Sequence, residues 1–426
     1  MKKTKKFCRA AALIVSVMLL CVLCNFAAFL IDTEDMREHT WQGCLMLGEQ
    51  QGIPQMVGGF SAAQLDNFTS VLILKTAGYV GEETLVQKAL AGYRVDAPAE
   101  AGQSEWDAFC TYEFGENSPS GGLSYSRYWH GYTLPLRLLL CVLNVSNIQM
   151  LLYFVQLALF VCVILLMIKR GLGRLVPGFF LSYFLLMPFA VSICLQYVPV
   201  TLLALGACAA ILLWDEKIDS TIGMPAFFIL LGILANYFDL LTFPLAALGF
   251  PIVLLLALRL KGEDSFLRLF LLTAFCGIGW ALGYAGMWAF KWVLVDMISE
   301  YSTIWGLVTQ IFLRTSDNGG DLSRVGVVMR NLNVILAKTS YLLLIAVTGV
   351  ITLIPAAKAL IRRGARFDAR ALMLLIVAAV PFVWYLVMSN HSFDHTYYTY
   401  RNVTMSVIAG FAFIAFCLKE KSGDAS

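Results

Sequence analysis

The feature that most constrains this chain is the recurrence of apolar runs of about 20 residues, such as "LLYFVQLALFVCVILLMI" (151–168). A run of this length crosses a hydrocarbon core about 30 Å thick when it forms a helix. The chain is 59% hydrophobic and only 14% charged, whereas soluble domains carry about 25% charged residues. Because backbone polar groups in lipid must be satisfied within their own segment, we expect an all-α, polytopic helical membrane protein.

The runs predict about ten transmembrane helices. Their expected ranges are 10–31, 148–168, 175–195, 198–213, 224–238, 243–258, 269–290, 340–361, 371–388 and 403–418. The start "MKKTKKFCR" suits a cleaved signal peptide, but the run after it is longer than the usual 7–15 residues. We therefore interpret it as a retained first span.

Basic residues orient the spans. Lys and Arg concentrate in the short loops 169–174, 258–268 and 358–370, and such loops lie in the cytoplasm. The protein is thus predicted to be a multi-pass cell-membrane protein with cytoplasmic N- and C-termini. The net charge of +3 gives no reason to expect a nucleic-acid partner.

This topology divides the chain into six parts. Residues 1–31 are the cytoplasmic start and first helix, and 32–147 form a long helical extracellular loop lying on the membrane surface. Residues 148–290 hold transmembrane helices 2–7, and 291–339 form a second extracellular loop. Residues 340–418 hold helices 8–10, and 419–426 are a cytoplasmic tail. Cys44 and Cys110 fall in the first loop, where they could pair in a disulfide.

An aromatic and basic group lies near the end of the first loop, in "YSRYWHGYTLPLR" (125–137). Trp and Tyr favour the membrane–water boundary, so Tyr128 and Trp129 alone would also fit a plain aromatic belt. Arg127 and His130 favour a binding site, because a guanidinium makes charge-assisted contacts to phosphate or carboxylate.

A second such group occurs in the short outer loop "SNHSFDHTYYTYRN" (389–402). It holds His391, His395, Tyr398 and Arg401, so we expect the two groups to share one polar substrate-binding pocket at the outer face. The spacing of the two histidines also occurs in zinc sites, but the expected site contains no metal. A divalent cation at Asp394 stays an alternative, and the cofactor is otherwise unknown.

Candidate catalytic acids lie on the same side of the membrane. Asp32, Glu34 and Asp35 follow the first span directly, although a solvated loop start explains them equally well. Asp66 is either a base or a helix cap, since Asp favours capping positions. Asp239 is expected in a tight turn between two spans, where an ionisable group is costly and typically binds a substrate or a basic partner.

The layout resembles the GT-C superfamily of membrane glycosyltransferases, with a long first outer loop and acids soon after the first span. Three pieces resemble an uncharacterised multi-pass membrane protein group of Gram-positive bacteria: "LDNFTSVLILKTA" (65–77), "YSRYWHGYTLPLRLLL" (125–140) and "NHSFDHTYYTYRN" (390–402). The GT-C resemblance implies an enzyme that moves a sugar from a polyprenyl-phosphate carrier to a cell-envelope glycan or lipid acceptor. Its partners would be this lipid-linked sugar donor, the acceptor and membrane lipids.

The implied reaction is an inverting transfer. A carboxylate would deprotonate the acceptor hydroxyl, and positive charge from Arg127, His130, His395 or Arg401 would stabilise the departing lipid phosphate. Two alternatives stay open. One is an O-antigen-type polymerase or ligase of lipid-linked polysaccharide, and the other is a non-enzymatic transporter or flippase. The uncharged span centres and the lack of an evident repeat argue against transport.

Overall fold

The computed structural model describes residues 2–95, 103–111, 122–299, 302–363 and 366–419. This part of the chain is almost entirely helical, which confirms the all-α class. Its named strands are two residues long and pair antiparallel in two small sheets. β1 (Tyr93–Arg94) pairs with β2 (Leu123–Ser124), and β3 (Arg366–Phe367) pairs with β4 (Leu418–Lys419).

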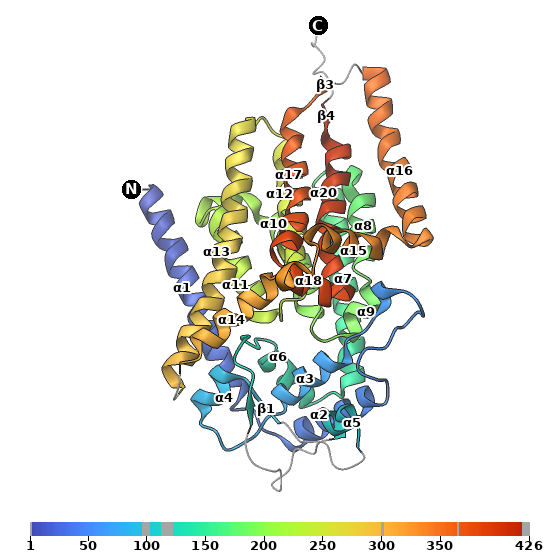
Figure 1. The fold of residues 1–426 in the computed structure, drawn as a ribbon. Coiled ribbons are helices and arrows are strands. Elements are labelled where there is room, and N and C mark those ends of the chain that lie inside the picture. The colour runs from blue at the N-terminus through green and yellow to red at the C-terminus, as the bar shows by residue number, and fades with distance from the viewer. Residues whose placement is uncertain (1, 96–102, 112–121, 300–301, 364–365, 420–426) are drawn as a thin grey trace.

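Long apolar helices indicate a membrane protein. Within the described residues, five segments are long and apolar enough to cross a membrane. They are Thr4–Ala28 of α1 (Lys2–Ala28), α7 (Val145–Lys169), α10 (Val198–Thr221), α13 (Phe266–Ile298) and Ala369–Val387, which contains α17 (Leu372–Val387). A sixth results if α15 (Arg324–Leu336) and α16 (Thr339–Arg363), bent by 80°, count as one span. In Figure 1, α13, α16 and α17 run roughly up and down the view.

The expected number of ten spans is therefore not confirmed, although helices occur in all ten ranges. Three of the remaining helices have only 14 to 16 residues: α11 (Met224–Phe238), α12 (Leu245–Leu260) and α20 (Val403–Phe416). The expected span 175–195 is divided into α8 (Val176–Leu185) and α9 (Pro188–Ile193).

The division between α8 and α9 has a local cause. Met187 has a left-handed backbone with a φ of 59°, and the residue before a proline avoids helical geometry. The break exposes the carbonyl groups of Leu185 and Leu186. The Tyr400 hydroxyl donates to the first at 3.1 Å, and Arg401 Nε donates to the second at 2.8 Å. Residues from a distant part of the chain thus supply hydrogen-bond donors to the carbonyl groups at the break.

α11 and α13 pack very closely because glycines on each helix lie against the backbone of the other. A Cβ atom at Gly283 would overlap the Ile229 carbonyl oxygen, and one at Gly232 would overlap the Trp280 carbonyl oxygen. Small residues at such positions let helix backbones approach closely in membranes. This pair fixes the end of α11, from which the Asp239 turn follows.

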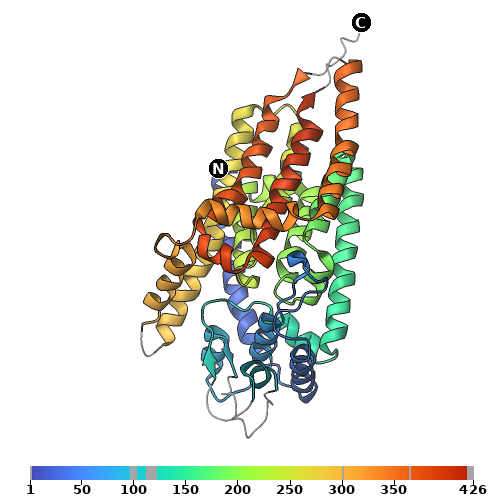
Figure 2. The ribbon, with the colours of Figure 1, turned by 45° about the vertical axis from the view of Figure 1, so that its right-hand side comes forward.

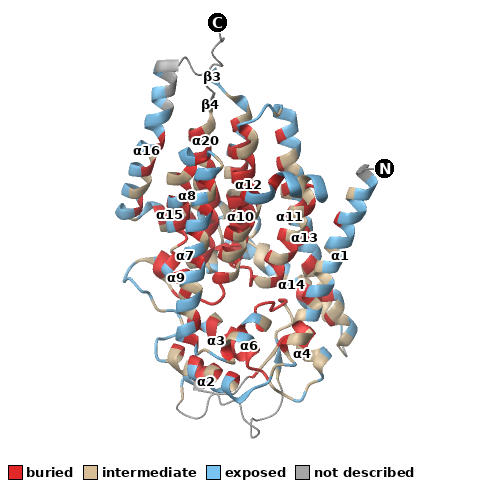
Figure 3. Cartoon of the chain, turned by 180° about the vertical axis from the view of Figure 1, so that it is seen from behind, coloured by how far each residue is buried: buried red, intermediate tan, exposed pale blue. Residues whose placement is uncertain are grey.

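The described residues between 32 and 144 form a helical layer at one end of the molecule (Figure 1). Its helices are α2 (Glu34–Gly48), α3 (Asn67–Ala77), α4 (Leu85–Ala91), α5 (Glu105–Thr111) and α6 (Thr133–Leu140). The start of α1 and the end of α20 both lie away from this layer. In Figure 3 buried residues concentrate in the centre of the molecule, including α10, α12 and α20.

Short helices lie at mid-height in Figure 1, above this layer. They are α14 (Ile304–Thr315), α15, α18 (Ser389–Asp394) and α19 (Thr396–Thr399), with a turn of 3-10 helix, η5, at Tyr400–Asn402. Figure 2 shows α15 crossing the molecule at this level. The histidines of the C-terminal group lie on or beside these helices.

Candidate functional site

Arg314 joins the two polar groups that the sequence suggested. It lies near the end of α14, and its Nη2 donates to the Tyr128 hydroxyl at 2.8 Å. Its Nη1 lies 3.0 Å from His391 Nδ1. One guanidinium therefore bridges the aromatic segment near residue 128 and α18, which are far apart in sequence. We call Tyr128, Arg314, His391 and His395 the arginine–histidine cluster.

The protonation of His391 follows from its partners. Its Nε2 lies 2.8 Å from the Leu241 carbonyl, which only accepts, so Nε2 carries the proton. Nδ1 then accepts from Arg314, and the ring is neutral. Burial, assisted by the nearby Arg314 and His395, holds the pKa of His391 well below its ordinary value. His391 thus orients Arg314 without adding a second positive charge.

A strained turn positions the Leu241 carbonyl. Leu241 has a φ of 63°, a conformation that non-glycine residues adopt at a cost. The Asp239 carboxyl stabilises the turn, since it accepts from the Thr242 hydroxyl at 2.6 Å and the Thr242 N–H at 3.0 Å. Asp239 is buried, and burial raises its pKa to about 7. The sequence assigned it to substrate binding, whereas its hydrogen bonds here hold the turn behind His391.

His395 is the member of the cluster with free ring nitrogens. Among the described residues no hydrogen bond to either nitrogen is found, and the ring is half-buried. It stacks on Tyr398, with ring centroids 5.1 Å apart, and lies 4.9 Å from His391. Burial and Arg314 lower the pKa of His395, while Asp394 and Asp66 oppose this shift. A neutral, reachable imidazole beside a guanidinium can accept a proton.

Asp66 caps α3. One carboxylate oxygen accepts from the Thr69 N–H at 2.9 Å, and the other accepts from the Thr69 hydroxyl at 2.8 Å and the Tyr397 hydroxyl at 3.2 Å. Asp66 is 3% exposed. Its oxygens are occupied, so its visible role is to end the turn before α3 and to connect this layer to Tyr397.

The aromatic segment is fixed by internal contacts. His130 has a φ of 57°, and its ring nitrogens lie 2.7 Å from the Tyr132 hydroxyl and the Tyr125 carbonyl. Burial, with a smaller effect from Lys291, lowers the pKa of His130 to about 3. The Trp129 indole donates to the Met287 carbonyl at 2.8 Å. Neither side chain is presented to a substrate, and both position the adjacent Tyr128.

Two arginines that the sequence placed in the site have other surroundings. Arg401 is fully buried, and besides Leu186 its nitrogens donate to the Tyr397 carbonyl at 2.9 Å and the Ala62 carbonyl at 3.3 Å. It therefore joins several segments around the α8–α9 break. Arg127 is half-buried, and its guanidinium lies 5.9 Å from the centre of the Tyr125 ring.

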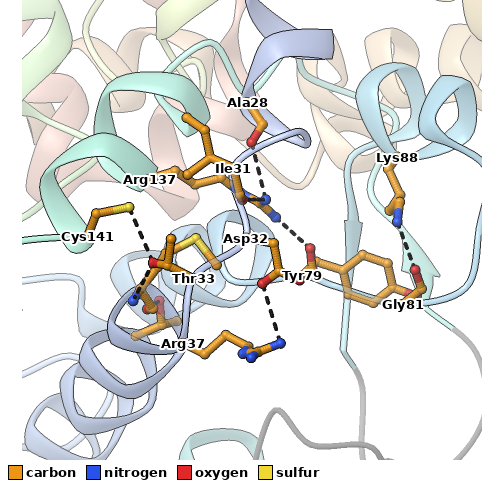
Figure 4. Close-up of polar contacts among 12 residues, drawn as sticks. Ala28, Ile31, Asp32, Thr33, Arg37, Tyr79, Gly81, Lys88, Arg137 and Cys141 are labelled. Carbon is orange, nitrogen blue, oxygen red and sulfur yellow. Dashed lines mark hydrogen bonds and ion pairs between the residues drawn. The ribbon is translucent and has the colours of Figure 1, made fainter.

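Asp32, Glu34 and Asp35 are exposed at the start of α2. Asp32 forms an ion pair with Arg37, 3.4 Å from Nη1 to Oδ1. Figure 4 shows it beside Arg137, whose buried guanidinium donates to the carbonyl groups of Ala28, Ile31 and Tyr79. The structure does not bring these three acids into the arginine–histidine cluster.

The structure also bears on the expected disulfide and on the zinc spacing of the two histidines. Cys44 and Cys110 are buried and both free. Both ring nitrogens of His391 are occupied, so the two histidines do not form a zinc pair. In the described part of the chain, no group of three or more His, Cys, Asp or Glu side chains could hold a metal ion.

Arg314 is the residue that sequence reasoning missed. The signal was present in "IWGLVTQIFLRT" (304–315), where apolar residues recur at helical spacing and Arg314 lies seven residues after Leu307. Residues seven apart share one face of a helix. A buried Leu307 therefore predicts an inward Arg314.

Comparison of the chain with protein-family models, curated proteins and solved structures finds no match. The chemistry of the cluster is therefore the basis for a function.

Proposed function

We propose that this chain is an integral membrane glycosyltransferase of GT-C type. It would transfer a sugar from a polyprenyl-phosphate carrier to a cell-envelope acceptor at the outer face of the membrane. The observation that carries the proposal is Arg314, a guanidinium held between Tyr128 and His391 beside the free imidazole of His395. These are the groups that such a transfer needs: a cation for a phosphate and a base for a hydroxyl.

Arg314 is suited to bind the lipid phosphate. Its Nε is buried and has no hydrogen-bond partner, and a buried donor without a partner costs about 1–3 kcal/mol. A phosphate oxygen would satisfy it, because guanidinium groups bind phosphate through several N–H donors. The neutral His391 leaves the positive charge of Arg314 available for the anion.

His395 is suited to act as the general base. Its free ring nitrogen takes the proton of the acceptor hydroxyl, and the hydroxyl oxygen attacks the anomeric carbon of the donor sugar. The bond from that carbon to the phosphate oxygen breaks, and its electron pair leaves with the lipid phosphate. Arg314 stabilises the charge that develops there. The ring of Tyr398, stacked on His395, offers a face for a sugar.

The proposal includes the expected topology. The chain would cross the membrane about ten times, with cytoplasmic termini, the layer 32–144 outside and the lipid tail among the spans. On this topology the arginine–histidine cluster lies at the outer boundary of the membrane, where a polyprenyl phosphate presents its head group. Asp66 and Asp239 act by holding Tyr397 and the Leu241 turn.

A transfer assay tests the proposal. The full chain is reconstituted in lipid nanodiscs with radiolabelled sugars on a panel of polyprenyl-phosphate donors and a mixture of cell-envelope acceptors. We expect His395→Gln to lower kcat about 100-fold or more, a typical loss for a general base. Arg314→Gln should also abolish most transfer, whereas Arg268→Gln, which removes an exposed arginine paired with Asp264, should not.

Two results would contradict the proposal. The first is full activity in both site variants. The second is that no donor supports sugar transfer by a preparation in which fluorescence quenching and hydrogen exchange show α14 to be in place.

A further inference from the structure

α14 presents two different faces. Leu307 and Arg314 are seven residues apart and lie on one face. Leu307 is 6% exposed, and Arg314 contacts Tyr128 and His391. Trp305 and Phe312 are also seven apart, and they are 76% and 68% exposed. At 100° per residue the two pairs lie on nearly opposite sides of the helix.

The outward face has little protein to cover it. α14 packs chiefly against α18 and the adjoining α13. The end of α13, which contacts α14, also carries exposed apolar residues: Val293 is 51% exposed and Met297 is 77% exposed. Single exposed apolar side chains are normal on a soluble surface, but a Trp and a Phe exposed on the same face of one helix mark an interaction surface. We call Trp305 and Phe312 the apolar strip of α14.

The partner that fits this strip is the bilayer. α13, which contacts α14, is one of the helices long enough to span a membrane, so the apolar strip lies beside the end of a candidate span. Trp305 suits the headgroup level, where an indole has both an apolar and a polar environment. Amphipathic helices bind lipid surfaces by inserting such a face.

We propose that α14 is embedded in the outer-leaflet surface through Trp305 and Phe312, and that this embedding holds Arg314 against Tyr128 and His391. The embedding of α14 does not depend on the proposed reaction. The role given to Arg314 names how the proposed site is held in place, and this part rests on the proposed function. The bilayer thereby becomes part of the site, because lipid on one face of α14 keeps the arginine on the other face in position.

Fluorescence quenching tests the embedding. The full chain is reconstituted in nanodiscs whose phospholipid acyl chains carry bromine, and its emission is compared with that in ordinary lipid. The contribution of Trp305 is taken as the difference between the wild type and Trp305→Tyr. We expect more than half of this contribution to be quenched. Trp106→Tyr is the control, since Trp106 lies in α5 and donates to the Gly48 carbonyl.

Hydrogen exchange tests the second part. In the double variant Trp305→Ser and Phe312→Ser, we expect the amides of 304–315 to exchange at least tenfold faster in nanodiscs. Thr309→Ser, an exposed substitution on the same side of α14, should leave exchange unchanged. Trp305 emission that bromine does not quench would overturn the proposal. A second copy of the chain that covers the strip in place of lipid would give this result. Unchanged exchange in the double variant would overturn the coupling to Arg314.

These readouts do not require transfer. A quenched Trp305 and fast exchange in the double variant, without transfer from any donor, would support the embedding and reject the glycosyltransferase. Sugar transfer by a protein whose Trp305 is not quenched would support the glycosyltransferase and reject the embedding.

Discussion

Replacement of Asp239 by Asn should stabilise the protein, and the gain should grow as the pH rises. The carboxyl is 2% exposed, and burial raises its pKa to about 7 from an ordinary 3.8. The described residues include no ion pair to it. A folded state that binds its proton more tightly than the unfolded state loses stability as the pH rises.

The magnitude follows from the two pKa values. Each pKa unit corresponds to about 1.4 kcal/mol, so the shift from 3.8 to about 7 gives a full cost of about 4.5 kcal/mol well above pH 7. The cost is absent below pH 3.8, where both states are protonated, and it is complete above the folded pKa. Between pH 5 and pH 8 the wild type should lose about 2–3 kcal/mol that the variant keeps.

Asparagine is a close mimic of the protonated acid. Its side-chain oxygen can accept from the Thr242 hydroxyl and N–H, as Asp239 does, so the turn should survive. Stability is measured by thermal unfolding of the purified protein in one detergent at pH 5 and pH 8. The control is Asp32→Asn, an exposed carboxylate paired with Arg37, for which we expect a change below about 1 kcal/mol at both values.

A destabilised Asp239→Asn variant at pH 8 would refute this reasoning. It would mean that the carboxylate form is stabilised in the folded protein by a positive partner. A stability gain that does not depend on pH would refute it as well, because desolvation of a charge requires that the charge titrates.

Three further outcomes are expected. Arg137→Met should lower the free energy of unfolding by about 3 kcal/mol or more, because three carbonyl groups lose a buried donor. The control Arg37→Met should cost under about 1 kcal/mol, and equal losses in the two variants would contradict a structural role of Arg137. The pH profile of transfer should fall only below pH 6.5 on its acidic side, since the pKa of His395 is lowered, and that limb should disappear in His395→Gln; a limb that persists would assign the base elsewhere. Tyr128→Phe should weaken donor binding less than tenfold, because Arg314 keeps its contact with His391; a loss as large as that of Arg314→Gln would make the hydroxyl a direct ligand.

The sequence predicted helices because hydrophobic length is a strong and local signal. It did not predict how many of them cross the membrane. The reason is clearest at Met187 and Pro188, which divide one apolar run into α8 and α9. The 80° bend between α15 and α16 likewise depends on what those helices pack against, which no local pattern records.

The sequence also pointed to the two polar groups that approach each other, since each combines Arg and His with the Tyr and Trp that are expected at a membrane boundary. It could not distinguish an arginine with an unpaired buried N–H, such as Arg314, from one whose N–H groups are used within the fold. Arg401 and Arg127 resemble Arg314 in sequence terms, but Arg401 is occupied by backbone carbonyls at a helix break. Which carbonyls lack a partner is a property of the fold. Asp66 proved to have the capping geometry that was one of its two interpretations.

The most direct test of the account is the affinity of the reconstituted protein for polyprenyl monophosphate. Binding is measured in nanodiscs for the wild type, Arg314→Gln and Arg268→Gln. We expect Arg314→Gln to raise Kd at least tenfold, while Arg268→Gln, at an exposed site, leaves Kd within twofold. Equal affinity of Arg314→Gln and the wild type would contradict a lipid-phosphate site at this arginine.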